Sequence, residues 1–272
     1  EIAEVVDQVA KETGKEYLFI SRSDSTLRGH YPLETTILKD EYEKNTGKKI
    51  DGEVLCPFFK EGGRFTIDDV HYVQYDDTLV PAAETEFAKD KTFGYTVSNL
   101  KEYVEEKTQG AYKKENVTAI SLENIRELNY DKIEEQLLAV EDFNKVIVNA
   151  IDYVDVKIFC VALFRAMKKG KNFMFRTAAA IVKVMGGVSN QPLLTREQMV
   201  VKETDNGGII VVGSHTDKTT RQMEKLRENK DIAFVELNAT LVNDEAAFAE
   251  EVERCLALEE EYISSGKSVC VY

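Results

Sequence analysis

The sequence predicts an α/β protein made of two α/β domains with mainly parallel sheets, the second of them truncated. Short apolar runs typical of buried strands alternate with segments of helical periodicity, a pattern that indicates βαβ units. The chain has 272 residues, more than the roughly 100–200 residues of a typical domain. Residues 191–207 show little apolar periodicity and have turn-forming residues near both ends, so we expect a linker there.

The expected strands of the first domain, residues 1–190, are short apolar runs. They lie at 16–21, 51–59, 117–122 and 145–151, with a strand or ribbon at 70–80. Residues 60–69 are expected to form a loop, because they contain a glycine pair and an aspartate pair. A further short apolar run precedes Arg176 and Thr177, which we expect at the start of a helix.

Helices are expected where apolar residues recur at helical spacing. Gly14 would be a suitable C-cap for the first helix, Pro32 suits a first turn, and Ser98 or Asn99 would cap another helix. The expected helices cover residues 1–16, 32–42, 96–108, 130–141 and 155–170.

The second domain is expected to begin with a βαβαβ unit. The expected strands lie at 208–214, 232–237 and 268–272, and the helices at 216–229 and 244–266. We expect the remainder of this second parallel sheet to lie beyond Tyr272.

Charge and cysteine usage exclude several classes of function. The chain carries 49 acidic and 35 basic residues, a formal charge of -14, which repels nucleic acid and anionic membrane surfaces. Residues 1–16 are too charged for a signal peptide or a membrane span. The four cysteines and three histidines are scattered without zinc-ligand spacing, so we expect buried free thiols, no structural metal and a cytoplasmic location. Formation of a homodimer is left open.

The segment SRSDSTLRG, residues 21–29, is the strongest candidate for a site. It follows an expected strand, where ligands of open parallel sheets bind. Asp24 could accept a proton, Ser25 and Thr26 offer hydroxyl donors, and Arg28 supplies a planar fork suited to a carboxylate or phosphate. A polar turn that caps the following helix would use the same residues, and this alternative stays open.

Other strand ends carry weaker signals for anion binding. Arg64 follows a glycine pair, Arg176 and Thr177 lie at an expected helix start, and Glu86 and Asp90 belong to a run of carboxylates. Solvated turns, a helix cap with a salt bridge and an exposed helix face explain these patterns equally well. After the next apolar strand come polar residues that could bind phosphate, although the spacing of a P-loop is absent: Ser214, His215 and Thr216.

Taken together and in order, five segments resemble the four-carbon acid sugar kinase family, long catalogued as a domain of unknown function. They span about residues 21 to 222 and read SDSTLRGHYPLE, CPFFKEGGRFTIDDVHYV, ETEFAKDKTFGYTVSNL, FRTAAAIVKVMGG and VVGSHTDKTTRQ. Five ordered matches are far more specific than any one of them.

The resemblance implies a kinase that transfers the γ-phosphoryl group of ATP, with Mg²⁺, to the terminal hydroxyl of threonate, erythronate or a 3-oxo-tetronate. It implies a sugar-acid-binding domain at 1–190 and the first part of a nucleotide-binding domain at 208–272. Asp24 is the candidate catalytic base, and Arg28 is expected to hold the substrate carboxylate. The implied substrate-binding residues are Ser25, Arg28, Gly29, Arg64, Arg176 and Thr177, and the implied ATP contacts are Ser214, His215 and Thr216.

The sequence departs from the family pattern in ways that suggest missing parts. An acidic motif on a first strand and a glycine-rich nucleotide loop are expected in family members and are not in this sequence, and the family often has Gly at the position of Asp69. We therefore expect the isolated chain to bind a sugar acid with little or no turnover. A non-catalytic module that senses a sugar acid is the alternative.

Overall fold

The computed structural model describes residues 1–200 and 202–272 and confirms the predicted α/β class. These residues fall into two compact units, Glu1–Asn190 and Gln191–Tyr272, each with a parallel sheet of its own. Among the described residues, no helix combines the length and the apolar character needed to cross a membrane. All four cysteines are buried free thiols, as predicted.

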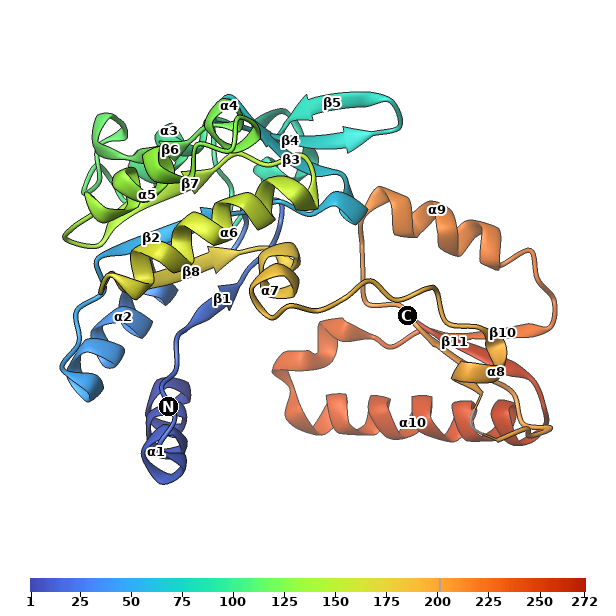
Figure 1. Ribbon diagram of the computed structural model, residues 1–272. Coiled ribbons are helices and arrows are strands. Elements are labelled where there is room, and N and C mark those ends of the chain that lie inside the picture. Colours follow the sequence, from blue (N-terminus) through green and yellow to red (C-terminus); the bar gives the residue numbers. More distant parts are fainter. Residues whose placement is uncertain (201) are drawn as a thin grey trace. The chain divides into compact units, whose positions relative to one another are not determined.

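The first unit is built on a five-stranded parallel sheet (Figure 1). In spatial order its strands are β1 (Ile20–Arg22), β8 (Phe173–Thr177), β2 (Gly52–Cys56), β7 (Asn144–Val148) and β6 (Thr118–Ile120). Because all neighbours are parallel, every strand ends at the same edge of the sheet. The loops that follow the strands therefore gather at that edge, where α/β proteins bind ligands.

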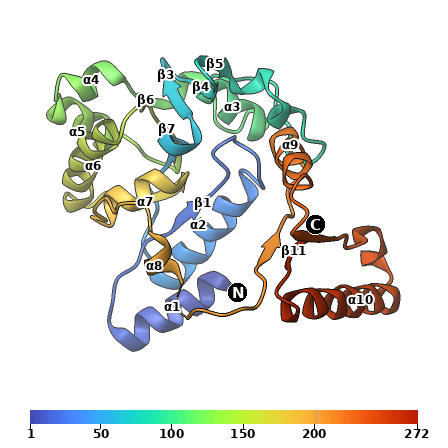
Figure 2. The same cartoon turned by 90° about the vertical axis from the view of Figure 1, so that its right-hand side faces the viewer.

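Helices cover both faces of this sheet (Figures 1 and 2). The main core lies between the sheet and α4 (Leu122–Arg126), α5 (Tyr130–Leu138), α6 (Tyr153–Lys168) and α7 (Ala179–Met185). The opposite face packs against α2 (Leu33–Thr46) and α3 (Leu100–Lys107), and α1 (Ile2–Thr13) lies on α2. The expected cap of α3 is confirmed, because Asn99 Oδ1 accepts hydrogen bonds from the backbone N–H groups of Lys101 and Glu102.

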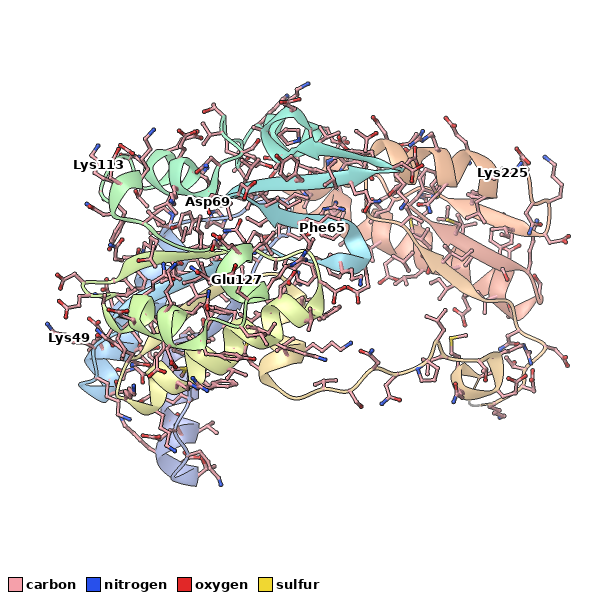
Figure 3. The ribbon with its side chains drawn as sticks, turned by 45° about the horizontal axis from the view of Figure 1, so that its top comes forward. Lys49, Phe65, Asp69, Lys113, Glu127 and Lys225 are labelled. Carbon is pink, nitrogen blue, oxygen red and sulfur yellow. The ribbon has the colours of Figure 1, made fainter. Side chains whose placement is uncertain are left out.

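An antiparallel ribbon replaces the loop predicted for residues 60–69. Its strands are β3 (Arg64–Ile67), β4 (Val70–Tyr75) and β5 (Thr78–Pro81). Asp68 and Asp69 form the β3–β4 turn with φ of 48° and 67° (Figure 3). The aspartate pair therefore marks a two-residue hairpin turn, a role that Asp fills more easily than most residues. It also explains why glycine would suit the position of Asp69.

Two strands of the first sheet, β1 and β8, depart most from the prediction. β1 begins at Ile20, because the preceding Tyr17 and Phe19 pack on Tyr42 of α2 instead of pairing with a neighbouring strand. β8 was predicted only as a short apolar run, yet it lies between β1 and β2. Its apolar signal is short because Arg176 and Thr177 end the strand, and the helix start expected there falls at Ala179.

The second unit has the predicted βαβαβ order. Its elements are β9 (Ile209–Val211), α9 (Asp217–Leu226), β10 (Ile232–Val235), α10 (Glu245–Ser264) and β11 (Ser268–Val271), preceded by the short α8 (Arg196–Met199). The three strands form a parallel sheet in the order β10-β11-β9. Ala233, Val235 and Val269 form its core with Cys255 of α10.

A buried ion pair joins two central strands of the first unit. Glu53 of β2 and Lys145 of β7 lie opposite each other in register, and both side chains are fully buried. Lys145 Nζ is 2.8 Å from Glu53 Oε2 and faces the rings of Tyr112 and Phe143, 4.1 and 3.5 Å from their centroids. Burial lowers the pKa of Lys145, and the charge of Glu53 opposes that effect.

We expect loss of one partner to be far more harmful than loss of both. Lys145→Met should lower the free energy of unfolding by about 3–5 kcal/mol, because it leaves the Glu53 carboxylate buried without a counter-ion. The double variant Glu53→Leu/Lys145→Met should recover most of that loss. Urea unfolding followed by circular dichroism measures both, and equal stability of the single and double variants would contradict the expectation.

Candidate functional site

The segment 23–29 borders a cleft at the carboxyl edge of the first sheet. It follows β1 directly, and Ser23 N–H donates to the carbonyl of Thr177, 2.8 Å away, at the end of neighbouring β8. The cleft has a volume of about 330 Å³. Its lining residues are Ser23, Asp24, Arg28, Gly29, Glu34, Asp90, Phe93 and Arg176.

Asp24 is fixed by its own loop. The backbone N–H of Thr26 donates to Oδ1 at 3.2 Å, the hydroxyl of Thr26 donates to Oδ2, and Arg28 Nε donates to Oδ2 at 2.7 Å. Burial alone would raise the pKa of Asp24, but the hydrogen bonds from Thr26 and Arg28 outweigh it and lower that pKa. Asp24 is therefore an ionised acceptor held in one orientation.

The backbone of this loop is held by buried side chains. Four consecutive carbonyl oxygens, those of residues 25–28, each accept a hydrogen bond from a side chain elsewhere in the first unit. The donors, in that order, are His71 Nε2 at 2.8 Å, Tyr95 OH at 2.8 Å, Tyr103 OH at 2.7 Å and Arg176 Nη2 at 3.4 Å. Burial raises the pKa of both tyrosines, so their hydroxyls stay protonated and can donate.

His71 fills this role as a neutral ring. Its Nε2 donates to the Ser25 carbonyl, so Nδ1 is the acceptor and the hydroxyl of Thr66 donates to it at 3.0 Å. The ring is fully buried, and burial lowers the pKa of His71 to about 4. His71 is therefore a fixed hydrogen-bond donor at neutral pH.

The loop has a strained backbone. Leu27 has φ of 69° although it is a bulky residue and only 6% exposed. Such conformations persist where the surrounding structure enforces them, often at functional sites. Gly29 has φ of 129°, and a Cβ at this position would lie 2.9 Å from Arg176 Nη2. Only glycine allows the loop to approach the arginine this closely.

Three predicted arginines lie around this loop. The guanidinium groups of Arg28 and Arg64 lie 5.1 and 5.5 Å from the ring centroid of Phe87. Arg176 is only 5% exposed, and its guanidinium lies 5.0 Å from the ring centroid of Tyr31. Burial lowers the pKa of Arg64. Stacked guanidinium groups of this kind are held in place and can still donate in the ring plane.

The structure thus brings together part of the predicted set. Asp24, Arg28, Gly29 and Arg176 line the cleft, and Arg64 shares the Phe87 ring with Arg28. Two other predicted residues do not line it. The carbonyl of Ser25 accepts a hydrogen bond from His71. Thr177 is fully buried, and its carbonyl accepts a hydrogen bond from the Ser23 N–H.

Sequence reasoning missed Glu34 and Phe93 of the cleft and three of the four donors beneath the loop, His71, Tyr95 and Tyr103. Glu34 lies within the family-like segment that contains Arg28, so that segment already pointed to it. His71 and Tyr95 also lie within the family-like segments. No other histidine or cysteine lies close to His71 in the sequence, so no motif drew attention to it. Its contact with Ser25 joins residues 46 positions apart, which no local pattern reveals.

The second unit has a cleft of its own, of about 570 Å³. It lies where β9 and β11 end, and apolar residues such as Met223, Leu237 and Tyr272 line much of it. Ser214 and His215 border it as well. Thr216 is instead the N-cap of α9, its side chain accepting from the backbone N–H of Thr219. This arrangement offers an apolar cleft next to polar groups at a helix N-terminus, which suits a nucleotide.

Comparisons with known proteins agree with this division into two units. The family described as "Sugar-binding N-terminal domain" matches residues 1–185, and the one described as "Nucleotide-binding C-terminal domain" matches residues 209–272. No curated protein matches the sequence.

Two solved structures share the fold. A Haemophilus influenzae protein from a domain-of-unknown-function family aligns with a TM-score of 0.57 at 17% identity, over 99% of this chain and 60% of its own. A Salmonella typhimurium LT2 protein, provisionally described as a tRNA synthase, aligns with a TM-score of 0.58 at 14% identity, over 96% of this chain and 57% of its own. The chain therefore spans less than two thirds of each of these proteins.

Substitution of Gly29 tests how tightly the loop approaches Arg176. Gly47→Ala is a matched control, because Gly47 also has positive φ, 69°, but an added Cβ there meets no described atom within 4 Å. We expect the control to lose about 1–2 kcal/mol of unfolding free energy. Gly29→Ala should lose at least about 1 kcal/mol more, because its Cβ also displaces the Arg176 guanidinium. Equal losses in urea unfolding would contradict the close approach.

Acidification should destabilise the first unit through His71. The folded pKa of His71 is about 4, whereas an exposed histidine has a pKa of about 6.5, so between these pH values only the unfolded chain binds the proton. This stability is complete above about pH 6.5 and declines as the pH falls toward 4, by on the order of 3 kcal/mol. His71→Gln removes the titration and should show a flatter dependence of urea midpoint on pH. Parallel pH profiles of the two proteins would exclude this role.

Proposed function

The chain belongs to the four-carbon acid sugar kinase family, and on that basis we propose that it forms the substrate-binding domain and the first part of the ATP-binding domain of a sugar-acid kinase. The proposed reaction transfers the γ-phosphoryl group of ATP to the terminal hydroxyl of a four-carbon sugar acid such as threonate, erythronate or a 3-oxo-tetronate. The proposed location is the cytoplasm, because four buried free thiols favour a reducing compartment.

The observation that carries the proposal is the mixture of charges in the first cleft. Arg28 and Arg176 line it together with three carboxylates, those of Asp24, Glu34 and Asp90. A polyphosphate lying wholly within the cleft would meet more carboxylates than arginines. A sugar acid has one carboxylate for an arginine and several hydroxyls that can donate to carboxylates, so it matches both kinds of group.

Asp24 is the proposed catalytic base. Its lowered pKa keeps it ionised at neutral pH, and its fixed orientation would let it accept the hydrogen of the substrate's terminal hydroxyl. Arg28, 2.7 Å from Asp24, would stabilise the charge of the transferred group. Phosphoryl transfer depends mainly on such positioning and charge stabilisation. Ser25, Gly29, Arg64 and Thr177 would shape and support this substrate site.

ATP is proposed to bind at the cleft of the second unit. Its apolar side would take the base, and Ser214, His215 and Thr216 would lie near polar parts of the nucleotide. ATP would supply the γ-phosphoryl group. Residues 1–200 and 202–272 contain no group of three potential His, Cys, Asp or Glu metal ligands. Mg²⁺ would therefore be held largely by the phosphates of ATP.

The function is tested with the full-length protein that contains this chain. ADP release is measured with ATP, Mg²⁺ and each stereoisomer of threonate and erythronate. We expect turnover of at least one of these acids, while the 272-residue chain alone binds it with little or no turnover. A full-length protein inert toward every four-carbon sugar acid would overturn the proposal.

Asp24→Asn tests the base directly. In the full-length protein it should lower kcat about 100-fold or more with a smaller change in KM, because the variant keeps the shape but cannot accept the proton. Asp131→Asn is the control, since the side chain of Asp131 is 99% exposed on α5. A kcat for Asp24→Asn within a few-fold of the control's would exclude Asp24 as the base.

A further inference from the structure

Arg176 is a buried cation with one hydrogen-bond donor unsatisfied. Its Nη2 donates to the Arg28 carbonyl at 3.4 Å and the guanidinium also interacts with the Tyr103 hydroxyl, whereas Nη1 is buried and makes no hydrogen bond of good geometry to any residue that the structure describes. An unsatisfied buried donor is destabilising, and more so when it is charged. Arg176 lines the cleft, so a ligand oxygen can supply the missing acceptor.

Glu34 places an acceptor beside this donor. Its Oε2 lies 3.9 Å from Arg176 Nη1, too far for a hydrogen bond, and its Oε1 accepts from the hydroxyl of Ser21. The Glu34 side chain is 45% exposed and also lines the cleft. The cleft therefore presents a cationic donor and an anionic acceptor side by side, each with hydrogen-bonding capacity to spare.

Arg28 is less available for the substrate carboxylate. Its Nε lies 2.7 Å from Asp24, its Nη1 lies 3.7 Å from Asp90, and its guanidinium faces the Phe87 ring. Two carboxylates already oppose its charge. Arg176 faces one carboxylate at a longer distance and has an unsatisfied N–H, so the substrate carboxylate gains more from Arg176.

We propose that Arg176 Nη1 and Glu34 Oε2 together recognise a carboxylate and the hydroxyl on the adjacent carbon, so that the site selects 2-hydroxy carboxylates. The carboxylate accepts from Arg176, and the 2-hydroxyl donates to Glu34. This inference rests on the proposed sugar-acid function and adds an orientation: the carboxylate lies at Arg176 and Glu34, and the terminal hydroxyl extends toward Asp24.

The pair also rejects related ligands. An acid without the 2-hydroxyl offers no hydrogen-bond donor to Glu34. Its carboxylate would then lie next to the Glu34 carboxylate with no donor between the two negative charges. A phosphate group has more negative charge and no adjacent hydroxyl donor. A 2-oxo acid presents an acceptor where Glu34 requires a donor. Threonate, erythronate and 3-oxo-tetronate all carry the 2-hydroxyl that the pair requires.

Calorimetric titration with a tetronate and its 2-deoxy analogue, 3,4-dihydroxybutanoate, tests the inference. We expect the protein to bind the preferred stereoisomer of threonate or erythronate about 10- to 100-fold more tightly than the analogue. Glu34→Ala should reduce that preference to less than about 3-fold. Arg176→Gln should weaken binding of both ligands, and thermal unfolding shows whether it remains folded.

Two surface variants are controls. Glu41→Ala alters a glutamate on the same helix as Glu34, and Arg22→Gln alters an exposed arginine on β1, and neither residue lines the cleft. Both should bind the two ligands as the unmodified protein does. If Arg176→Gln does not fold, the ligand preference of the unmodified protein and of Glu34→Ala decides the question.

The outcomes separate this inference from the proposed function. Equal affinity for the tetronate and its 2-deoxy analogue would overturn the inference while leaving sugar-acid binding intact. The same holds if Arg28→Gln abolishes tetronate binding and a folded Arg176→Gln does not. If the unmodified protein binds no four-carbon acid at all, the proposed function fails, and this inference fails with it.

Discussion

The site depends on the inward direction of four consecutive carbonyl groups, those of residues 25–28. A loop at the end of a strand usually satisfies its carbonyls with water or with its own turn. Here buried side chains satisfy each of them, so Asp24 and Arg28 can line the cleft while the backbone between them faces the interior. This arrangement offsets the unfavourable backbone of Leu27, because a different conformation would leave buried donors unpaired.

One of these donors, His71, depends on the position of the antiparallel ribbon. His71 is on β4, and its ring is oriented by Thr66 on β3. β3 is joined to the segment after β7 by hydrogen bonds between Thr66 and Ala150. At the β3–β4 turn, Asn149 Oδ1 accepts a hydrogen bond from the Asp69 N–H and Asn149 Nδ2 donates one to the Asp69 carboxylate, each at 2.8 Å. The parallel sheet thus fixes the ribbon, and the ribbon fixes the loop.

The sequence predicted most elements of both units, because the short-range periodicity of apolar residues indicates strands and helices. It failed where contacts between distant residues decide the outcome. β8 has a short apolar run, and only its place between β1 and β2 makes it a central strand. At the candidate site, Asp24 and Arg28 were singled out because a strand end followed by polar residues is a local pattern, and Gly29 was added by the family resemblance. Glu34 and His71 lie within family-like segments, but their contacts with Ser21 and Ser25 exist only after folding, so their roles were not predicted.

The two buried cations of the first sheet, Lys145 and Arg176, lie in different surroundings. Lys145 and Arg176 project from the same face, because Glu53 and Leu55 of β2, which lie opposite them in register, are two residues apart. Lys145 has a carboxylate oxygen at 2.8 Å and aromatic rings on its other sides, so its charge has a counter-ion at contact distance, although Nζ makes no hydrogen bond of good geometry. Arg176, nearer the carboxyl edge, has its carboxylate at 3.9 Å and an unsatisfied N–H beside a cleft. The two cations therefore differ in the distance to their counter-ion and in access to a cleft. Stability alone would favour a counter-ion at contact distance, as at Lys145, and the longer distance at the ligand-binding edge of the sheet favours a role of Arg176 in binding.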